Sequence, residues 1–312
     1  IVDFLIDGEE AWHLAYADMQ LAQELVAIST WWWDSNFELF RDPTSHTYQS
    51  TNERYWNTIM GTLDYLDYLD VPSKVLVNQF WNQDGFLSDL TVDANLLERA
   101  ENGNDLIEYM GAANQIWGSY TLDFDSVDFK DTIIKKWVLS DGYESLPDYG
   151  LAPFYPPYTI DMSEVPLGLG SIDFPHASWH QKSIIIDQNL AYVGGMNFTK
   201  EYWDTNEHKV FESRRMNYDA TTEEKLEVQA KLAQPDNVPW KDYFARVQGP
   251  VVHDVMRVFD WRWWYQQYIG AEYSDKSTMI DELKAPSAPL EGGVQAQVVT
   301  TMPPPFYENS LM

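Results

Sequence analysis

The sequence predicts an α/β protein in which strands and helices alternate along the chain. Two observations support this fold class. Short apolar stretches bounded by turn residues, typical of buried strands, are separated by segments whose apolar residues recur at helical spacing. The composition, 45% hydrophobic and 15% aromatic over 312 residues, is also sufficient for a large hydrophobic core in one large or two small domains.

The chain begins as strand, helix and strand. Ile1 to Ile6 is short and apolar and ends at Asp7-Gly8, a pair that favours a break. Apolar residues from Ala11 to Leu25 recur at the spacing of a helix, and Val26 to Thr30 is the next strand, which leads into Trp31-Trp32-Trp33. Two further strand candidates follow, at residues 74–80 and 132–139.

The middle of the chain changes character between Asp141 and Trp179. This stretch has six prolines and many aromatic residues without a sustained period, which indicates a long loop. Such loops often carry function, so we expect residues 141–179 either to contact lipid or to cover the sheet. Arg214 to Ala233 predicts a polar surface helix, and Pro250 to Tyr268 predicts an aromatic-rich helix with one buried face.

A linker is predicted near the C-terminal end. Lys284 to Gly293 is rich in Pro, Gly and Ala, whereas Val294 to Thr300 predicts a new strand and Glu308 to Met312 the first turn of a helix. We therefore expect residues 1–283 to form one unit, residues 284–293 to be a linker, and residues 294–312 to begin a second, truncated unit.

The net charge restricts the class of partner. Twenty Lys and Arg against 49 Asp and Glu give −29, which opposes binding to nucleic acid and to strongly anionic lipid surfaces. Zwitterionic lipid is compatible with this charge; a plainer interpretation is that the charge only keeps the surface solvated. There is no cysteine and no apolar run of the ~20 residues that a membrane span needs, so we expect a soluble or peripheral protein whose compartment stays open, secretion included.

The most informative stretch is WHQKSIIIDQNLAYVGGMN, residues 179–197. His180 and Lys182 are two apart, so on a strand both side chains lie on one face. Asp187 begins a turn, and the chain returns as a second strand from Leu190 to Val193. An imidazole beside an ammonium suits phosphoryl chemistry, because the imidazole can attack phosphorus while the ammonium neutralises the non-bridging oxygens.

An isolated H-x-K would be incidental in most proteins, but this one has a longer context. The stretch matches every fixed position of H-x-K-x(4)-D-x(6)-G-G-x-N, namely His180, Lys182, Asp187, Gly194, Gly195 and Asn197. This pattern resembles the HKD signature of the phospholipase D superfamily. Segments 5–24, 198–208 and 239–252 are similar to the first HKD lobe of the eukaryotic-type enzymes, and in PWKDYFARVQGPVV the resemblance assigns Asp242 as the carboxylate that orients the nucleophilic histidine.

The resemblance implies the fold and the mechanism. The fold is a mixed β-sheet flanked by helices on both faces, one lobe of a pseudo-twofold enzyme with two lobes. A histidine attacks the phosphodiester to form a phosphohistidine, and a second histidine from another HKD copy protonates the leaving alcohol. The implied catalytic residues are His180, Lys182, Asp187, Asn197 and Asp242. We expect Gly194, Gly195, Trp31, Trp32 and Trp33 at the substrate; the tryptophans could instead be core.

Only one HKD motif occurs in this chain. No Lys stands two residues after the other histidines, which are His13, His46, His176, His208 and His253. We expect the second lobe to follow residue 312 in the same gene product, to be a separate chain, or to be a second copy of this one.

The resemblance implies a phospholipase D that converts zwitterionic glycerophospholipid at a membrane or micelle surface to phosphatidic acid and a free alcohol, with transphosphatidylation. The alternatives are a phosphodiesterase or nuclease on another phosphodiester, and a non-catalytic lipid-binding lobe. The motif requires no cofactor. Some family members need calcium, but the sequence predicts no metal site: Asp204, Glu207 and His208 are expected to form an ordinary loop.

Overall fold

The computed structural model describes residues 1–79, 92–101, 106–113, 122–123, 171–172, 180–268, 280 and 283–300. A seven-stranded sheet lies at its centre, in the order β1-β9-β8-β7-β2-β3-β4. Its strands are β1 (Val2–Ile6), β2 (Val26–Thr30), β3 (Ser73–Gln79), β4 (Ile107–Ala113), β7 (Lys182–Ile186), β8 (Leu190–Gly194) and β9 (Tyr243–Gln248). The neighbours β2, β3 and β4 pair in parallel and all other neighbours are antiparallel, so the sheet is mixed, as the family resemblance implied.

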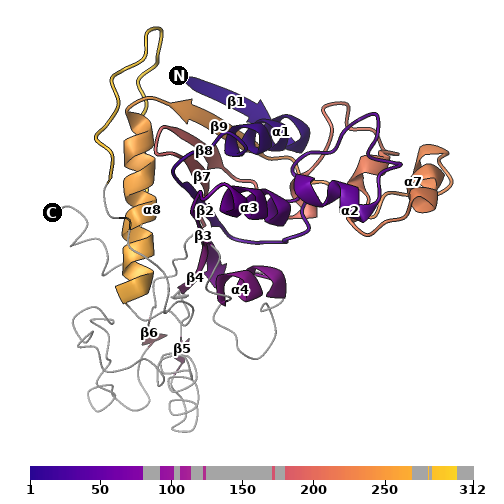
Figure 1. The fold of residues 1–312 in the computed structure, drawn as a ribbon, viewed down its shortest axis with the longest axis horizontal. Coiled ribbons are helices and arrows are strands. Elements are labelled where there is room, and N and C mark those ends of the chain that lie inside the picture. The colour runs from indigo at the N-terminus through magenta and orange to yellow at the C-terminus, as the bar shows by residue number, and fades with distance from the viewer. Residues whose placement is uncertain are drawn as a thin grey trace.

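Helices cover both faces of this sheet (Figure 1). Helices α1 (Gly8–Met19), α3 (Ile59–Tyr68) and α4 (Ala94–Glu101) pack on one face, and α8 (Val251–Tyr268) packs on the other. Two hydrophobic clusters, one on each side, hold these layers together. The predicted α/β class with a sheet between two helical layers is confirmed.

The central strands bury side chains on both faces. In β2, Val26 and Ile28 belong to the cluster under α1 and α3, whereas Ala27 between them belongs to the cluster under α8. In β7, Ile184 and Ile186 face the first cluster and Ile185 the second. Every residue of both strands is buried, which explains why they are apolar without a polar alternation.

A group of loops and short helices projects from the sheet on the side away from α8 (Figure 1). It includes the short elements α2 (Thr51–Arg54), η1 (Tyr55–Asn57), η3 (Lys200–Tyr202), η4 (Ser213–Arg215) and α7 (Thr222–Gln229). The helix predicted over residues 214–233 is shorter than expected: α7 begins at a capping box formed by Thr221 and Glu224. A separate pair of short strands, β5 (Leu122–Asp123) and β6 (Ser171–Ile172), is antiparallel.

Two predicted elements need correction. The first helix does not reach Leu25: α1 ends at Met19, Leu21 is exposed, and Leu25 packs in the cluster under α8, on the face opposite α1. Residues 294–300 do not form a strand. Their backbone is irregular and Val299 is 81% exposed, because no described strand lies beside them to accept their hydrogen bonds.

Several predictions lie outside the described residues. They are the strand at 132–139, the helical turn at 308–312, and the loop 141–179 apart from β6. Among the helices of the described part of the chain, none is both long and apolar enough to cross a bilayer.

Candidate active site

Four strand ends meet at one edge of the sheet. Because β7 is antiparallel to both β2 and β8, the start of β7 lies beside the ends of those two strands, with Ser29 opposite Ser183 and Lys182 opposite Gly194. The start of β9 joins the same edge, since Gly194 is opposite Phe244. Side chains that are far apart in the sequence, from Trp31 to Asp242, therefore gather at this edge.

The imidazole and the ammonium of the H-x-K lie together there. The Nζ atom of Lys182 is 2.9 Å from both ring nitrogens of His180 and 3.3 Å from the His180 carbonyl oxygen. Lys182 is 1% exposed, whereas His180 is open to solvent. The two groups are thus close together, and the imidazole is accessible from solvent.

Burial and charge tune both groups. Burial lowers the pKa of His180, and the Lys182 charge lowers it further, while Asp242 opposes both effects. Burial also lowers the pKa of Lys182 to about 8, again opposed by Asp242. Near neutral pH the imidazole is therefore favoured in its neutral, nucleophilic form, and the ammonium keeps its proton.

Asp242 directly precedes β9, and its carboxylate packs against Gly195 at the site. A Cβ atom on Gly195 would lie 2.2 Å from Oδ1 of Asp242 and 2.3 Å from Oδ2, a separation that real atoms do not adopt. Gly194 is constrained differently: its Cβ would lie 2.0 Å from the carbonyl oxygen of Tyr243. The first glycine thus lets β9 approach β8, and the second admits the carboxylate.

Asn197 holds the segment that follows β2 in place beside the site. Its buried side-chain oxygen accepts hydrogen bonds from the backbone N–H groups of Trp31 (3.0 Å) and Trp32 (3.2 Å) and from the hydroxyl of Thr30 (3.2 Å). The residue therefore fixes the segment that follows β2, and its fully used oxygen indicates a positioning role.

Comparison with known proteins agrees with this geometry. A family model described as Phospholipase D matches residues 168–294, a range that contains every residue of the H-x-K…G-G-x-N pattern and Asp242. Residues 168–294 of this chain thus have the sequence of a phospholipase D superfamily domain. The Arabidopsis thaliana protein phospholipase D zeta 1 is 27% identical over 115 residues, covering 33% of this chain and 10% of that protein. Phospholipase D alpha 3 of the same plant is 25% identical over 130 residues, covering 36% and 15%.

The chain thus spans about a tenth of the length of most of these curated relatives.

Two solved structures are also similar. NucT from Helicobacter pylori has 8% identity and a TM-score of 0.36, over 87% of this chain and 96% of that one. A phospholipase D family member, Nuc from Salmonella typhimurium, has 11% identity and a TM-score of 0.36, over 85% and 96%.

The three tryptophans after β2 have three different environments. The ring of Trp31 lies 4.6 Å from that of His180 and its centroid is 5.9 Å from the Lys182 ammonium, so Trp31 forms part of the site. Trp32 is half-buried and packs 5.8 Å from Trp240. Trp33 is 3% exposed and packs against Phe198 in the core, so its expected contact with substrate is wrong.

The expected position of Gly194 and Gly195 at the substrate stays a prediction. The atoms that an added Cβ would meet belong to Tyr243, Phe244 and Asp242. Both glycines therefore also shape the site, because they permit a close approach of backbone and carboxylate.

Asp187 lies away from the HKD site. It follows the last residue of β7, about 16 Å from Lys182 at ~3.3 Å per residue. Its carboxylate accepts hydrogen bonds from the backbone N–H groups of Gln23, Glu24 and Leu25, at 2.8 to 3.2 Å. A direct catalytic role requires contact with the reacting atoms, so the expectation for Asp187 needs correction: the residue holds the β7–β8 turn against the start of β2.

Sequence reasoning missed Arg262. This arginine of α8 is 1% exposed and donates from Nη1 to the Ser29 hydroxyl (2.6 Å) and to the side-chain oxygen of Gln181 (3.0 Å). It therefore supports the residue between His180 and Lys182 from the opposite face of the sheet. No local motif marks it, because its position depends on how α8 packs on the sheet.

Ion pairs within the chain hold the segment from Asp204 to His208 in place. The two ring nitrogens of His208 lie 3.1 Å from Asp7 and 3.0 Å from Asp204, and Arg215 lies 3.0 Å from the other oxygen of Asp204. Within the residues that the structure describes, no group of three or more His, Asp or Glu side chains has the arrangement of a metal site.

Proposed function

We propose that this chain is one lobe of a phospholipase D that hydrolyses the distal phosphodiester of zwitterionic glycerophospholipids, such as phosphatidylcholine. The products are phosphatidic acid and the free alcohol of the headgroup. One observation carries the proposal above the others: an accessible imidazole lies 2.9 Å from a buried ammonium, in a segment with the sequence of a phospholipase D superfamily domain.

The first step is attack on phosphorus. A ring nitrogen of neutral His180 forms a bond to phosphorus, and the bond from phosphorus to the headgroup oxygen breaks. Lys182 donates hydrogen bonds to the non-bridging oxygens as negative charge increases on them. The Asp242 carboxylate stabilises the positive charge that develops on the imidazole ring, which agrees with its effect on the pKa of His180.

The leaving alcohol needs a proton from a second acid. The described histidines outside the motif have other surroundings. His13 packs 4.6 Å from the Phe40 ring, His46 is buried beside Glu38, His208 lies between two carboxylates, and Nδ1 of His253 lies 2.9 Å from a carbonyl oxygen. We propose that a histidine of a second HKD copy supplies it, from the same gene product, a separate chain or a second copy of this one. Water then attacks the phosphohistidine, or another alcohol does so in transphosphatidylation.

The choice of a zwitterionic lipid rests on charge and on one aromatic ring. The net charge of −29 opposes a polyanionic substrate such as DNA. Trp31 lies beside the nucleophile, where its face can receive the quaternary ammonium of a choline headgroup.

The test is choline release from phosphatidylcholine vesicles by the full-length protein that contains this chain, with a nuclease assay run in parallel. We expect choline release by the unmodified protein, at least about 1,000-fold less by His180→Asn, and an acid-labile phosphoryl adduct on His180 during turnover. Nuclease activity without choline release would assign the site to another phosphodiester. Vesicle binding without either activity would instead indicate a non-catalytic lipid-binding lobe.

A further inference from the structure

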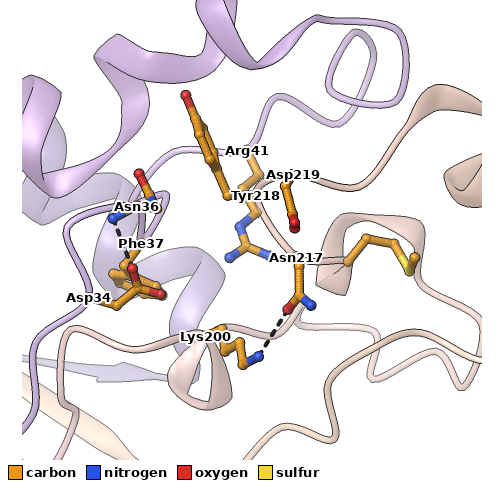
Figure 2. A pocket seen from close by; sticks show the side chains of 9 residues that line it. Asp34, Asn36, Phe37, Arg41, Lys200, Asn217, Tyr218 and Asp219 are labelled. Atoms are coloured by element: carbon orange, nitrogen blue, oxygen red, sulfur yellow. Dashed lines mark hydrogen bonds between the residues drawn. The ribbon is translucent and has the colours of Figure 1, made fainter. Parts of the chain in front are cut away.

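A pocket lies outside the HKD site and is lined by none of its residues. It has a volume of about 300 Å³, at the small end of the range for ligand sites. Its walls come from the segment after β2 and from the segments at residues 200 and 216–219 (Figure 2). The lining residues are Asp34, Asn36, Phe37, Arg41, Lys200, Met216, Asn217, Tyr218 and Asp219.

Arg41 is the unusual member of this lining. Its side chain is only 5% exposed, yet no carboxylate of the described residues lies within ion-pair distance of it. It donates from Nη1 to the carbonyl oxygen of Arg214 and stacks 4.5 Å over the Trp203 ring, and its buried Nε has no hydrogen-bond partner in that part of the chain. Figure 2 shows the guanidinium directed into the pocket, between Asp34 and Asn217. A buried guanidinium normally has an anionic partner, because an unpaired buried charge is costly.

A second cation faces the same space. Lys200 projects into the pocket opposite Arg41, and its ammonium donates to the side-chain oxygen of Asn217 at 3.1 Å (Figure 2). No described carboxylate pairs with this ammonium within 4.0 Å. Two cationic donors thus converge on a space large enough for a small anion.

Two further buried cations, Arg54 and Lys225, lie near Arg41. Arg54 and Lys225 are each 1% exposed, and the nearby buried carboxylate, Glu38, is 2.7 Å from Arg54. Repulsion among these cations agrees with the lowered pKa of Lys225, about 8, for which burial is the first cause and Arg54 the second. The buried cations Arg41, Arg54 and Lys225 thus have one buried carboxylate, Glu38, near all three, and an anion bound at Arg41 would offset part of their charge.

The remaining lining favours hydroxyl groups on the ligand. Asp34 and Asp219 contribute carboxylates, Asn36 and Asn217 amides, and Phe37 and Tyr218 aromatic rings. Carboxylates and amides bind hydroxyl groups well, whereas a second phosphate would be repelled by Asp34 and Asp219.

We propose that this pocket binds the phosphomonoester group of a small polyhydroxylated compound, with the phosphate on Arg41 and Lys200 and the hydroxyls on Asp34 and Asp219. The site is separate from His180, and the proposal does not depend on the reaction that His180 performs. The phosphomonoester can belong to a soluble polyol phosphate or to the headgroup of a lipid.

The test is isothermal titration calorimetry of the full-length protein with glycerol 3-phosphate, inorganic phosphate and glycerol. We expect glycerol 3-phosphate to bind more tightly than inorganic phosphate, and glycerol not to bind. Lys200→Gln should weaken glycerol 3-phosphate by about tenfold, since it removes a charge-assisted contact. Arg41→Gln should weaken it further; because Arg41 is buried, Lys200→Gln decides the result if that variant does not fold.

Two control variants locate the binding. Lys209→Gln removes an exposed cation outside the pocket and should change the affinity less than about twofold; His180→Asn should also leave it unchanged. Binding that is insensitive to Lys200→Gln, or lost in His180→Asn, would overturn the proposal. Vesicles of phosphatidylcholine with and without a phosphomonoester lipid separate the two sources. If only the lipid form binds, and does so through Lys200, the ligand is a lipid headgroup; if neither form depends on Lys200, the proposal is wrong.

Discussion

The carboxylate of Asp242 affects two groups whose required protonation states are opposite. His180 must be neutral to attack phosphorus, and Lys182 must be charged to stabilise the phosphoryl oxygens. The rate should therefore fall at acidic pH, through a His180 pKa lower than usual, and at basic pH, through a Lys182 pKa of about 8. Asp242 raises both pKa values, so its charge sets where the active window lies.

Asp242→Asn should move both limbs of the pH profile in the same direction. Loss of the negative charge lowers the pKa of His180 and that of Lys182, so the acidic and the basic limb of kcat/KM both shift to lower pH. The measurement is kcat/KM against pH on a soluble short-chain substrate, for both proteins. The position of the limbs is independent of the overall loss of rate; unmoved limbs would show that Asp242 acts only by steric positioning.

Alanine substitutions at the two neighbouring glycines should affect stability and catalysis differently. Gly194→Ala forces a Cβ atom against the backbone of β9, which cannot move away, and should lower the free energy of unfolding by about 3 kcal/mol. Gly195→Ala meets the Asp242 side chain, which can rotate away from His180. We expect this variant to lose less stability, about 1 kcal/mol, but at least about tenfold in kcat. Urea denaturation and steady-state kinetics measure the two effects; a Gly195→Ala enzyme with full kcat would contradict this account.

At the scale of elements, one carboxylate joins the β7–β8 turn to the start of β2. Asp187 has φ +52°, a left-handed conformation that Asp and Asn tolerate better than Ala, and it accepts hydrogen bonds from three successive backbone N–H groups. This connection fixes the far end of the strand pair whose near end carries His180 and Lys182.

Asp187→Ala should therefore destabilise the protein without slowing its chemistry. The lost acceptor and the strained turn should together lower the free energy of unfolding by about 2–3 kcal/mol. Asp187→Asn retains one oxygen and tolerates the turn, so it should lose less than about 1 kcal/mol. Chemical denaturation gives these values, and kcat below the melting range should stay within about twofold. A large loss of kcat with unchanged stability would restore the catalytic role that the family resemblance implied.

The sequence was informative where a pattern fixes a local geometry. The two-residue spacing of His180 and Lys182 sets them on one face of a strand, and the structure has them 2.9 Å apart. Where the outcome depends on packing, the sequence could not decide. Trp31, Trp32 and Trp33 are chemically identical, yet one lies at the nucleophile, one on Trp240 and one in the core. Arg262 likewise has its role only because α8 packs under β2 and β7.

At the scale of the whole molecule, the net charge should govern which surfaces the protein approaches. A charge of −29 repels an anionic bilayer over a distance set by the Debye length, which falls from about 10 Å at 0.1 M salt to about 3 Å at 1 M. A zwitterionic bilayer has little net surface charge, so attachment to it depends mainly on local contacts and is nearly independent of salt.

Vesicle co-sedimentation of the full-length protein at 0.1 M and 1 M salt tests this. Binding to phosphatidylcholine vesicles should change less than about twofold, whereas binding to vesicles with a third of anionic lipid should be weaker at 0.1 M and should increase at 1 M, as repulsion is screened. A basic protein shows the reverse dependence, because salt weakens its attraction to the same lipid. If binding to anionic vesicles is strongest at low salt, a local cationic surface outweighs the net charge, and the preference for zwitterionic substrate loses its electrostatic basis.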